Sequence, residues 1–306
     1  MTPGPGTDDA SETPLRSGFV AVVGRPNVGK STLVNALVGS KVSITSSRPQ
    51  TTRNSVRGVA NLAEPPAQIV LVDTPGLHRP RTALGTRLNR LVEDSLADTD
   101  LVAFLLDATQ KIGPGDRMLA GRLAAAADRT VLVVAKTDLA RPERVAEQLI
   151  EASSWDFAAY VPLSSVTGEG LDALRGEIVA RLPEGPAFFP PDMVTDQPDE
   201  LLAAEMVREQ YLERLHQELP HSLAVVVDEM TERPNGTLYV AATVVVERAS
   251  QKGIVIGRGG ALLKAVGEAA RMEMERRFAA PVYLDLRVRV EPDWQRRDLL
   301  LDRLGF

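Results

Sequence analysis

Cysteine is absent from this 306-residue chain, and histidine occurs only three times, at His78, His216 and His221. Disulfides and thiolate metal sites are therefore excluded, and a zinc cluster lacks ligands. No segment approaches the roughly 18 unbroken apolar residues of a membrane helix. We therefore expect a cytoplasmic protein in which any bound metal is a hard cation with oxygen ligands.

Positive charge is also scarce, because the formal net charge is −6. Bulk electrostatic attraction to nucleic acid is thereby excluded, so local basic patches must provide any such binding. Residues 1–16 are rich in Pro, Gly, Ser, Thr and acid, with neither an apolar segment nor a positive start. They predict a disordered tail and not a signal peptide. The remaining length suits roughly two globular domains.

Apolar strands alternate with helical stretches in the first part of the chain, residues 17–183. Such alternation implies crossover connections and a doubly wound, mostly parallel α/β sheet. The residues that follow each strand should then meet at one edge, where open α/β sheets bind ligands. A helix is predicted at Lys30–Val38, and strands at Phe19–Val23, Val56–Ala60, Gln68–Val72, Leu101–Leu106, Val131–Ala135 and Tyr160–Leu163.

A Pro- and Gly-rich segment follows, and it can continue neither a helix nor a strand. It predicts a linker at residues 184–198 and a second domain at 199–306. Strands joined by a turn and followed by helices indicate a small α+β domain. We expect a helix at Asp199–Leu219, strands at Ser222–Met230 and Thr237–Glu247, two helices about Gly257–Gly260 with the second at Ala261–Phe278, and a strand at Val282–Val290.

The first strand runs directly into the sequence Gly-Arg-Pro-Asn-Val-Gly-Lys-Ser at residues 24–31. Its glycines allow successive N–H groups to face a phosphate, and the next helix presents its positive end. Lys30 is predicted to reach the β- and γ-phosphates, and Ser31 to ligate Mg²⁺. The predicted nucleotide contacts here are Gly24, Asn27, Val28, Gly29, Lys30, Ser31 and Thr32.

A second phosphate-site element is Asp73-Thr-Pro-Gly76, at the end of another strand. Asp73 is predicted to hold Mg²⁺ through water, and the Gly76 N–H to meet the γ-phosphate. In the polar loop between the two motifs, Thr52 is the preferred hydroxyl for Mg²⁺, with Thr51 as the alternative. The predicted metal ligands are thus Ser31, Thr52 and Asp73, and the predicted catalytic residues are Lys30, Thr52 and Gly76.

A base site is predicted after the last two strands, at Lys136-Thr-Asp138 and at Ser164, Ser165 and Val166. A carboxylate at Asp138 can accept from guanine N1–H and from its exocyclic amine, whereas adenine offers an acceptor and no amine at those positions. The motif therefore favours GTP over ATP. The stem of Lys136 is expected to lie along the base.

In the second domain, a Gly-x-x-Gly turn between two helices lets a nucleic-acid backbone approach closely, as in the KH clamp on about four nucleotides. Residues 247–303 carry 12 Lys and Arg against 9 Asp and Glu, a modest local excess. The predicted RNA-binding residues are Lys252, Gly257, Arg258, Gly259, Gly260 and Lys264.

Together the nucleotide motifs resemble those of the translation-factor-related P-loop GTPases, and within them the group that contains Era, TrmE and EngA. Over residues ~17 to 306 the chain resembles the Era-type GTPases, which carry a type II KH domain. The resemblance implies a slow GTPase that uses GTP/GDP and Mg²⁺, binds 16S rRNA near its 3′ end, assists assembly of the 30S subunit, and associates peripherally with the membrane. We expect a monomer.

Two positions depart from related sequences. Ala135 stands where the family usually has Asn or Thr, which removes a side-chain hydrogen bond and predicts weaker nucleotide binding. Leu77 stands where many signalling GTPases carry a water-orienting glutamine, so we expect slow hydrolysis. In some relatives the residue matching Asn27 holds potassium, and the resemblance implies K⁺ stimulation here.

Three alternative functions remain open at this point. A tRNA-modifying GTPase would need a C-terminal cysteine and a folate-binding domain, and neither is present. A non-catalytic RNA-binding module that only senses nucleotide is suggested by Ala135 and Leu77. An ATPase is disfavoured by Asp138.

Overall fold

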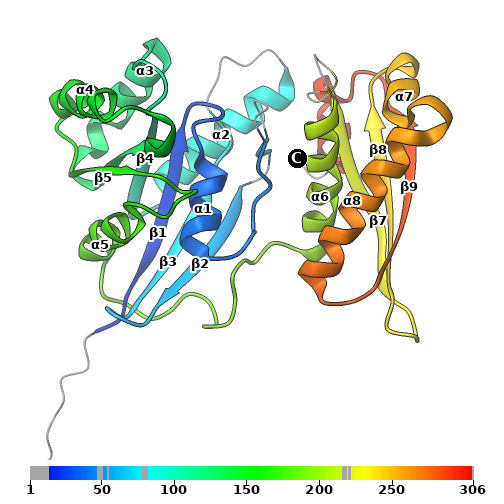
Figure 1. The fold of residues 1–306 in the computed structure, drawn as a ribbon, viewed down its shortest axis with the longest axis horizontal. Coiled ribbons are helices and arrows are strands. Elements are labelled where there is room, and N and C mark those ends of the chain that lie inside the picture. Colours follow the sequence, from blue (N-terminus) through cyan, green and yellow to red (C-terminus); the bar gives the residue numbers. More distant parts are fainter. Residues whose placement is uncertain are drawn as a thin grey trace, which may run out of the picture.

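The computed structural model describes residues 14–46, 51–53, 55–76, 82–215, 219 and 222–304. Most of the predicted tail, Leu77 and the three histidines lie outside these ranges. Figure 1 shows two layered units, an N-terminal one coloured blue to green and a C-terminal one coloured green to red. None of the described helices is both long and apolar enough to span a bilayer.

The N-terminal unit is a six-stranded sheet in the order β2-β3-β1-β4-β5-β6, in which only the β2–β3 pair is antiparallel. The predicted doubly wound, mostly parallel sheet is therefore confirmed. Its strands are β1 (Arg16–Gly24), β2 (Val56–Leu62), β3 (Ala67–Asp73), β4 (Leu101–Asp107), β5 (Thr130–Ala135) and β6 (Ala159–Leu163). Its helices are α1 (Lys30–Val38), α2 (Ala83–Ala97), α3 (Pro114–Leu123), α4 (Pro142–Ala152) and α5 (Leu171–Arg181).

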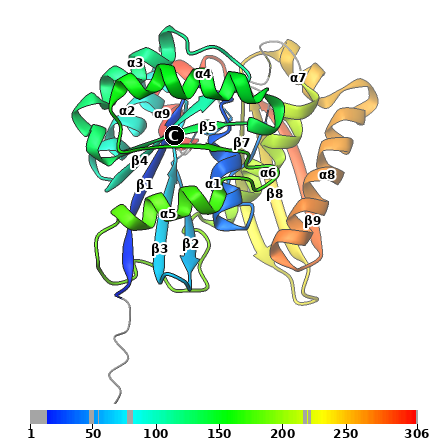
Figure 2. The same cartoon turned by 60° about the vertical axis from the view of Figure 1, so that its left-hand side comes forward.

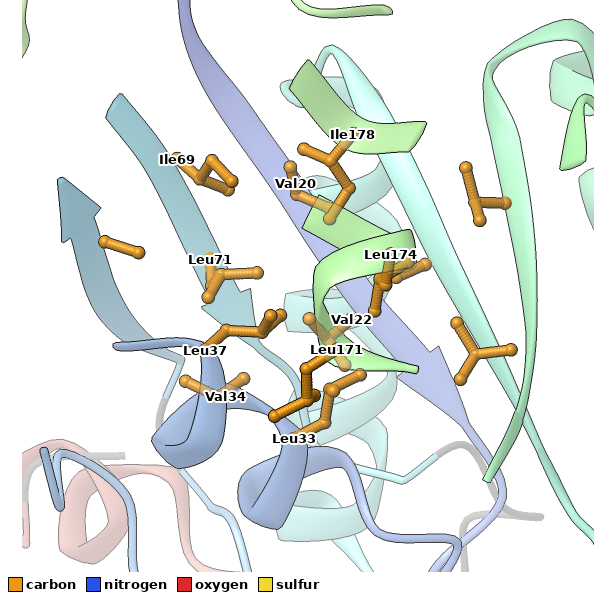
Figure 3. Packing of buried hydrophobic residues seen from close by; sticks show 14 of the residues in the cluster. Val20, Val22, Leu33, Val34, Leu37, Ile69, Leu71, Leu171, Leu174 and Ile178 are labelled. Carbon is orange, nitrogen blue, oxygen red and sulfur yellow. The ribbon is translucent and has the colours of Figure 1, made fainter. Parts of the chain in front are cut away.

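Helices cover both faces of this sheet, which is why the central strands are continuous apolar runs. On one face, α1 and α5 pack against alternate residues of the strands, as Figure 3 shows for Leu33, Leu174 and Ile178 around Val20 and Val22. On the other face, α3 and α4 pack against the remaining residues, including the fully buried Phe104. The two apolar layers hold the carboxyl ends of β1, β3, β4 and β5 at one edge.

The C-terminal unit is a three-stranded sheet whose two long helices pack on one face, while its short last helix packs on the other. Strand β8 pairs antiparallel with β7 and parallel with β9, so the predicted α+β domain is confirmed. Its core lies between the sheet and the helices α6 and α8. The elements are α6 (Asp199–Arg214), β7 (Leu223–Glu232), β8 (Leu238–Val246), α7 (Ala249–Ile256), α8 (Ala261–Phe278), β9 (Val282–Val290) and α9 (Asp298–Arg303).

One predicted element is too long. The helix expected at Asp199–Leu219 ends at Arg214, because Leu215 adopts an extended backbone conformation, with φ −90 and ψ 151. In that position the Leu215 side chain is buried in the core of the C-terminal unit. Helical periodicity alone did not reveal that this packing would end the helix.

The segment between the units, residues 184–198, lies along the edge strand β2. Thr195 forms a β-bridge with Gly58, and the Val59 N–H donates to the Val194 carbonyl at 2.8 Å. The Gln68 amide bonds three backbone groups of Phe188 and Phe189. The segment therefore covers an otherwise open sheet edge, which protects it from pairing with other chains.

Candidate nucleotide and RNA sites

The residues after β1 form a loop that ends at the N-terminus of α1. Gly29, at φ +110, precedes the first helical residue, and Asn27 is also left-handed at φ +64. Glycine adopts such angles without the steric cost that other residues pay. The loop and the helix therefore direct backbone N–H groups and the positive end of the helix dipole at one point, which suits a phosphate.

Lys30 reaches back across this loop. Its ammonium donates to the carbonyls of Gly24 at 3.3 Å and Arg25 at 3.1 Å, and the residue is only 7% exposed. Burial lowers the pKa of Lys30 to about 8, while the charge of Asp73 opposes that shift. A phosphate in the loop would supply a counter-charge at short range, so this ammonium fits an anionic ligand.

Three oxygen-bearing side chains from different elements meet beside Lys30. The hydroxyls of Ser31 and Thr52 are 3.0 Å apart, and the Thr52 hydroxyl is 3.4 Å from Asp73 Oδ2. Asp73 is fully buried, and its Oδ1 has no hydrogen-bond partner among the described residues. Burial raises the pKa of this carboxyl against the opposing effect of Ser31. Hydroxyl and carboxylate oxygens are the ligands that Mg²⁺ prefers, so the set fits that ion.

Thr51 and Thr52 differ in their surroundings. The Thr52 hydroxyl faces Ser31 and Asp73, whereas the Thr51 carbonyl accepts a hydrogen bond from Arg208 of the C-terminal unit. The geometry therefore favours Thr52 as the metal-side hydroxyl. Gly76 is also close to the loop, because a Cβ at this position would lie 2.9 Å from Pro26 atoms.

A cleft of about 450 Å³ runs over these groups. It is lined by Pro26, Asn27, Gly29, Lys30, Ser31, Thr32, Thr45, Ser46, Thr51, Thr52, Gly76 and Lys136. Sequence reasoning missed Thr45 and Ser46, whose only signal was their place in the polar loop after the first helix. The cleft brings together predicted residues from four separate chain segments.

The predicted base-site residues follow two neighbouring strands. Ala135 and Leu163 are register partners, so Lys136 and Ser164 leave the sheet side by side. The Lys136 ammonium donates to the Asn27 carbonyl at 2.6 Å, which places its stem over the phosphate loop. Asp138 is exposed, while the buried Ser164 hydroxyl accepts from the Val166 and Thr167 N–H groups. Ser165 continues the same turn.

The C-terminal unit contacts both sides of Thr52. We call residues 51–53 the switch segment. In addition to the Arg208 contact at Thr51, the Arg53 guanidinium donates to the Leu223 carbonyl at 2.6 Å and lies over the Trp294 ring. The loop after α1 is also attached, since Lys41 pairs with Glu209 of α6 and Glu273 of α8. In both views α6 faces this loop (Figures 1 and 2).

The Gly-x-x-Gly turn joins α7 and α8. Gly257, Gly259 and Gly260 all have positive φ, between 60° and 82°. Arg258 and Lys264 are exposed, and Lys252 is half-buried on α7. A groove of about 350 Å³ between α8 and β9 starts at this turn and is lined by Gly260, Leu263, Lys264, Gly267, Glu268, Arg271, Leu284 and Leu286. The three leucines were not predicted, because only the folded chain brings Leu284 and Leu286 of β9 beside Leu263 of α8.

Comparison with known proteins gives two family matches and full-length relatives. Residues 19–137 match the 50S ribosome-binding GTPase family, and residues 218–295 match the KH domain family. The chain is 51% identical to GTPase Era of Mycolicibacterium smegmatis, over 96% of this chain and 100% of that protein. It is 51% identical to GTPase Era of a Nocardioides species, over 95% and 96%.

Two solved structures are similar over almost the whole chain. One is a variant of Era from Aquifex aeolicus bound to GDP and AlF4⁻, with a TM-score of 0.91 and 38% identity over 95% of this chain and 99% of that one. The other is Era in complex with MgGDPNP and nucleotides 1506–1542 of 16S ribosomal RNA, with the same TM-score of 0.91, 38% identity and the same coverage.

These relatives confirm the predicted resemblance, the predicted order of a P-loop GTPase domain followed by a KH domain, and the predicted enzyme class. The alternatives of an ATPase and of a tRNA-modifying enzyme are thereby set aside. The chain belongs to the Era family of GTP-hydrolysing proteins, with a nucleotide-binding domain and a C-terminal KH domain.

Proposed function

We propose that this chain binds GTP and Mg²⁺ in the cleft beside α1 and hydrolyses GTP there, and that its KH domain binds 16S rRNA to assist 30S subunit assembly. The convergence of Ser31, Thr52 and Asp73 next to the buried Lys30 carries the nucleotide half of the proposal. These groups come from three chain segments and meet where a helix N-terminus favours phosphate. The proposed domains are residues 17–183 and 199–306, joined by 184–198.

The chain's own residues act mainly by positioning and by opposing negative charge. The Lys30 ammonium would stabilise charge on the phosphate oxygens, and the Gly76 N–H would hold the γ-phosphate. The Thr52 hydroxyl and Asp73 would hold Mg²⁺ together with Ser31. When bound, Mg²⁺ supplies charge neutralisation on the β- and γ-phosphate oxygens.

Guanine selectivity provides the direct test of the base site. We expect GTP to displace labelled GDP at a concentration at least about 100-fold lower than the concentration of ATP needed. The reason is that adenine lacks the two donors that would pair with the Asp138 carboxylate. An Asp138→Asn variant should lose most of this preference, because a neutral amide replaces the acceptor for both guanine donors. Equal displacement by GTP and ATP would contradict the assignment of Asp138.

Potassium is proposed to stimulate hydrolysis through Asn27. This residue lines the cleft and lies in the left-handed region, at φ +64, beside the expected phosphate position. A monovalent cation there would add positive charge where negative charge develops. We expect faster single-turnover hydrolysis in potassium than in sodium buffer, and no such difference for Asn27→Ala. Equal rates in the two buffers, or stimulation retained by the variant, would exclude this role.

RNA binding by the KH domain is proposed from the groove between α8 and β9. Its glycine-rich end allows close backbone approach, and Lys264 and Arg271 provide charge beside apolar walls on which bases can pack. The complex of the Era relative with a 16S rRNA fragment suggests the RNA. The predicted RNA-binding set is proposed to act at this groove and its turn: Lys252, Gly257, Arg258, Gly259, Gly260 and Lys264.

A charge reversal tests this surface. We expect Arg258→Glu combined with Lys264→Glu to weaken binding to a 16S rRNA 3′-end fragment at least tenfold. The slope of log K against log salt concentration should become shallower by roughly 0.7 for each lost phosphate contact. The matched control reverses Arg117 and Arg122, which lie on α3 and are also exposed. Equal losses of RNA affinity in the two double variants would mean that overall charge, and not a defined site, determines RNA binding.

The proposed cellular role is the one that the resemblance to Era-type GTPases implies. The protein is proposed to act as a cytoplasmic monomer on the assembling 30S subunit. Peripheral membrane association stays a prediction. Crosslinking to cellular RNA in the GTP and GDP states, followed by sequencing, tests the role, because a pool without enrichment of small-subunit rRNA ends would oppose it.

A further inference from the structure

Asp107 lies beside the base site although no predicted motif includes it. It is the last residue of β4 and the register partner of Ala135 at the end of β5. Alternate residues of these strands face α1, including Leu105 and Val133. Asp107 and Ala135 therefore both lie on the face of the sheet that carries the phosphate loop.

The Asp107 carboxylate is fully engaged on both oxygens. Oδ2 accepts from the Lys136 ammonium at 2.7 Å, and Oδ1 accepts from the Thr109 N–H at 2.9 Å and hydroxyl at 2.6 Å. Its side chain is 12% exposed. Burial alone would raise the pKa of Asp107, but the bonds from Lys136 and Thr109 hold it below its usual value. The group is a fixed anion near the loop.

Lys136 thereby connects two parts of the site. Its ammonium bonds both Asp107 and the Asn27 carbonyl, so the stem is held across Gly29, with Cε 3.9 Å from where a Cβ of Gly29 would lie. A lysine with four rotatable bonds loses much of its freedom when its end is fixed at two points. The stem is then preorganised for the face of a base.

Ala135 makes the contact between Asp107 and Lys136 more important for guanine binding in this chain. The residue is 2% exposed, and its methyl group offers no hydrogen bond to the loop or to the base. Asp107 is the register partner of Ala135 on β4, and its carboxylate bonds the Lys136 ammonium. We propose that Asp107 is a positioning residue for guanine binding, which holds Lys136 across the phosphate loop and so offsets the missing polar side chain at Ala135. This inference rests on the proposed function.

The first test is Asp107→Asn in the full chain. Because a charge-assisted bond is lost at a partly exposed pair, we expect GDP affinity to fall about 5- to 20-fold. KM for GTP should rise similarly, while kcat at saturating GTP stays within about twofold, because Lys30, Thr52 and Gly76 are untouched. A merely structural role would lower kcat and the apo melting temperature as well. Thr109→Val, which removes the hydroxyl donor to Oδ1 and keeps the N–H donor, should weaken GDP binding in the same direction by about two- to threefold.

The second test is a double-mutant cycle with Ala135→Asn. If Asp107 offsets the missing polar group, Asp107→Asn should weaken GDP binding by less in the Ala135→Asn background, by a factor of at least about three. Equal losses in both backgrounds would overturn the compensation. Asp172→Asn is the matched control, since Asp172 pairs with Arg175 on α5 at 2.8 Å and should leave GDP affinity unchanged.

Asp138→Ala separates failure of this inference from failure of the proposed function. If Asp138→Ala loses GDP affinity and Asp107→Asn does not, the positioning role is wrong and the base site stands. If neither variant loses affinity, the base site itself is misplaced, and the inference falls with it.

Discussion

A Lys30→Ala variant is expected to lose on the order of 10²–10³-fold in kcat/KM for GTP, as does removal of other preorganised electrostatic groups. The reason is that the ammonium is buried at the centre of the phosphate loop, where charge interactions are weakly screened. Among the described residues, no other lysine or arginine side chain donates to the Gly24 and Arg25 carbonyls, so none takes the position of the Lys30 ammonium. Single-turnover hydrolysis and GDP binding by calorimetry measure the loss.

Lys111→Ala is the control for this variant. Lys111 is an exposed lysine in the loop after β4, near the phosphate loop but outside the cleft lining. Its removal changes net charge by the same amount and should alter kcat/KM by less than about twofold, as is usual at exposed positions. A loss of less than tenfold for Lys30→Ala would contradict the phosphate site.

A Trp294→Ala variant is expected to cost about 3–5 kcal/mol in the free energy of unfolding of the C-terminal unit, the range for removing a large buried aromatic side chain. Trp294 is fully buried, and its indole N–H donates to the Ser222 carbonyl at 3.1 Å. It packs in a cluster that joins α2 of the N-terminal unit to the C-terminal sheet and α9: Leu84, Leu88, Ala224, Val245 and Leu301. Urea unfolding followed by circular dichroism measures the change.

The same variant should loosen the contact between the units, because Arg53 lies over the Trp294 ring at 5.7 Å. We expect faster proteolysis in the switch segment. Leu299→Ala is the control, since Leu299 lies on α9 but is 83% exposed, and it should change stability by less than about 0.5 kcal/mol. An effect of Trp294→Ala below about 1 kcal/mol would contradict a stabilising role for this cluster.

Arg53 shows how far the structure departs from a local interpretation of the sequence. In the sequence it ends the polar loop that contains Thr51 and Thr52, and nothing local indicates a partner for it. The structure buries it to 1% exposure, and burial, together with the neighbouring Arg208, lowers its pKa to about 9. Its hydrogen-bond acceptor, the Leu223 carbonyl, is 170 residues further along the chain. No local pattern can reveal such a partner.

The elements of the nucleotide site are different, because their signals are local. The strand before Gly24, the glycines of the loop and the helix that begins at Lys30 all follow from consecutive residues, and the predicted helix Lys30–Val38 has the same bounds as α1. The parallel sheet then requires that the segments after β3, β5 and β6 meet the loop at one edge. The order of the motifs along the chain was therefore sufficient to predict that these segments meet at one edge of the sheet.

By itself, the sequence determined the two fold classes, the order of the domains and the family, because backbone geometry and hydrophobic periodicity depend on near neighbours. Only the tertiary structure decided that the Thr52 hydroxyl lies beside Ser31 and Asp73, that Asp107 holds Lys136, and that the switch segment is held by Arg208 and Trp294. These contacts join residues far apart in the chain, and their energies depend on burial and exact distance. Spacing along a sequence contains neither quantity.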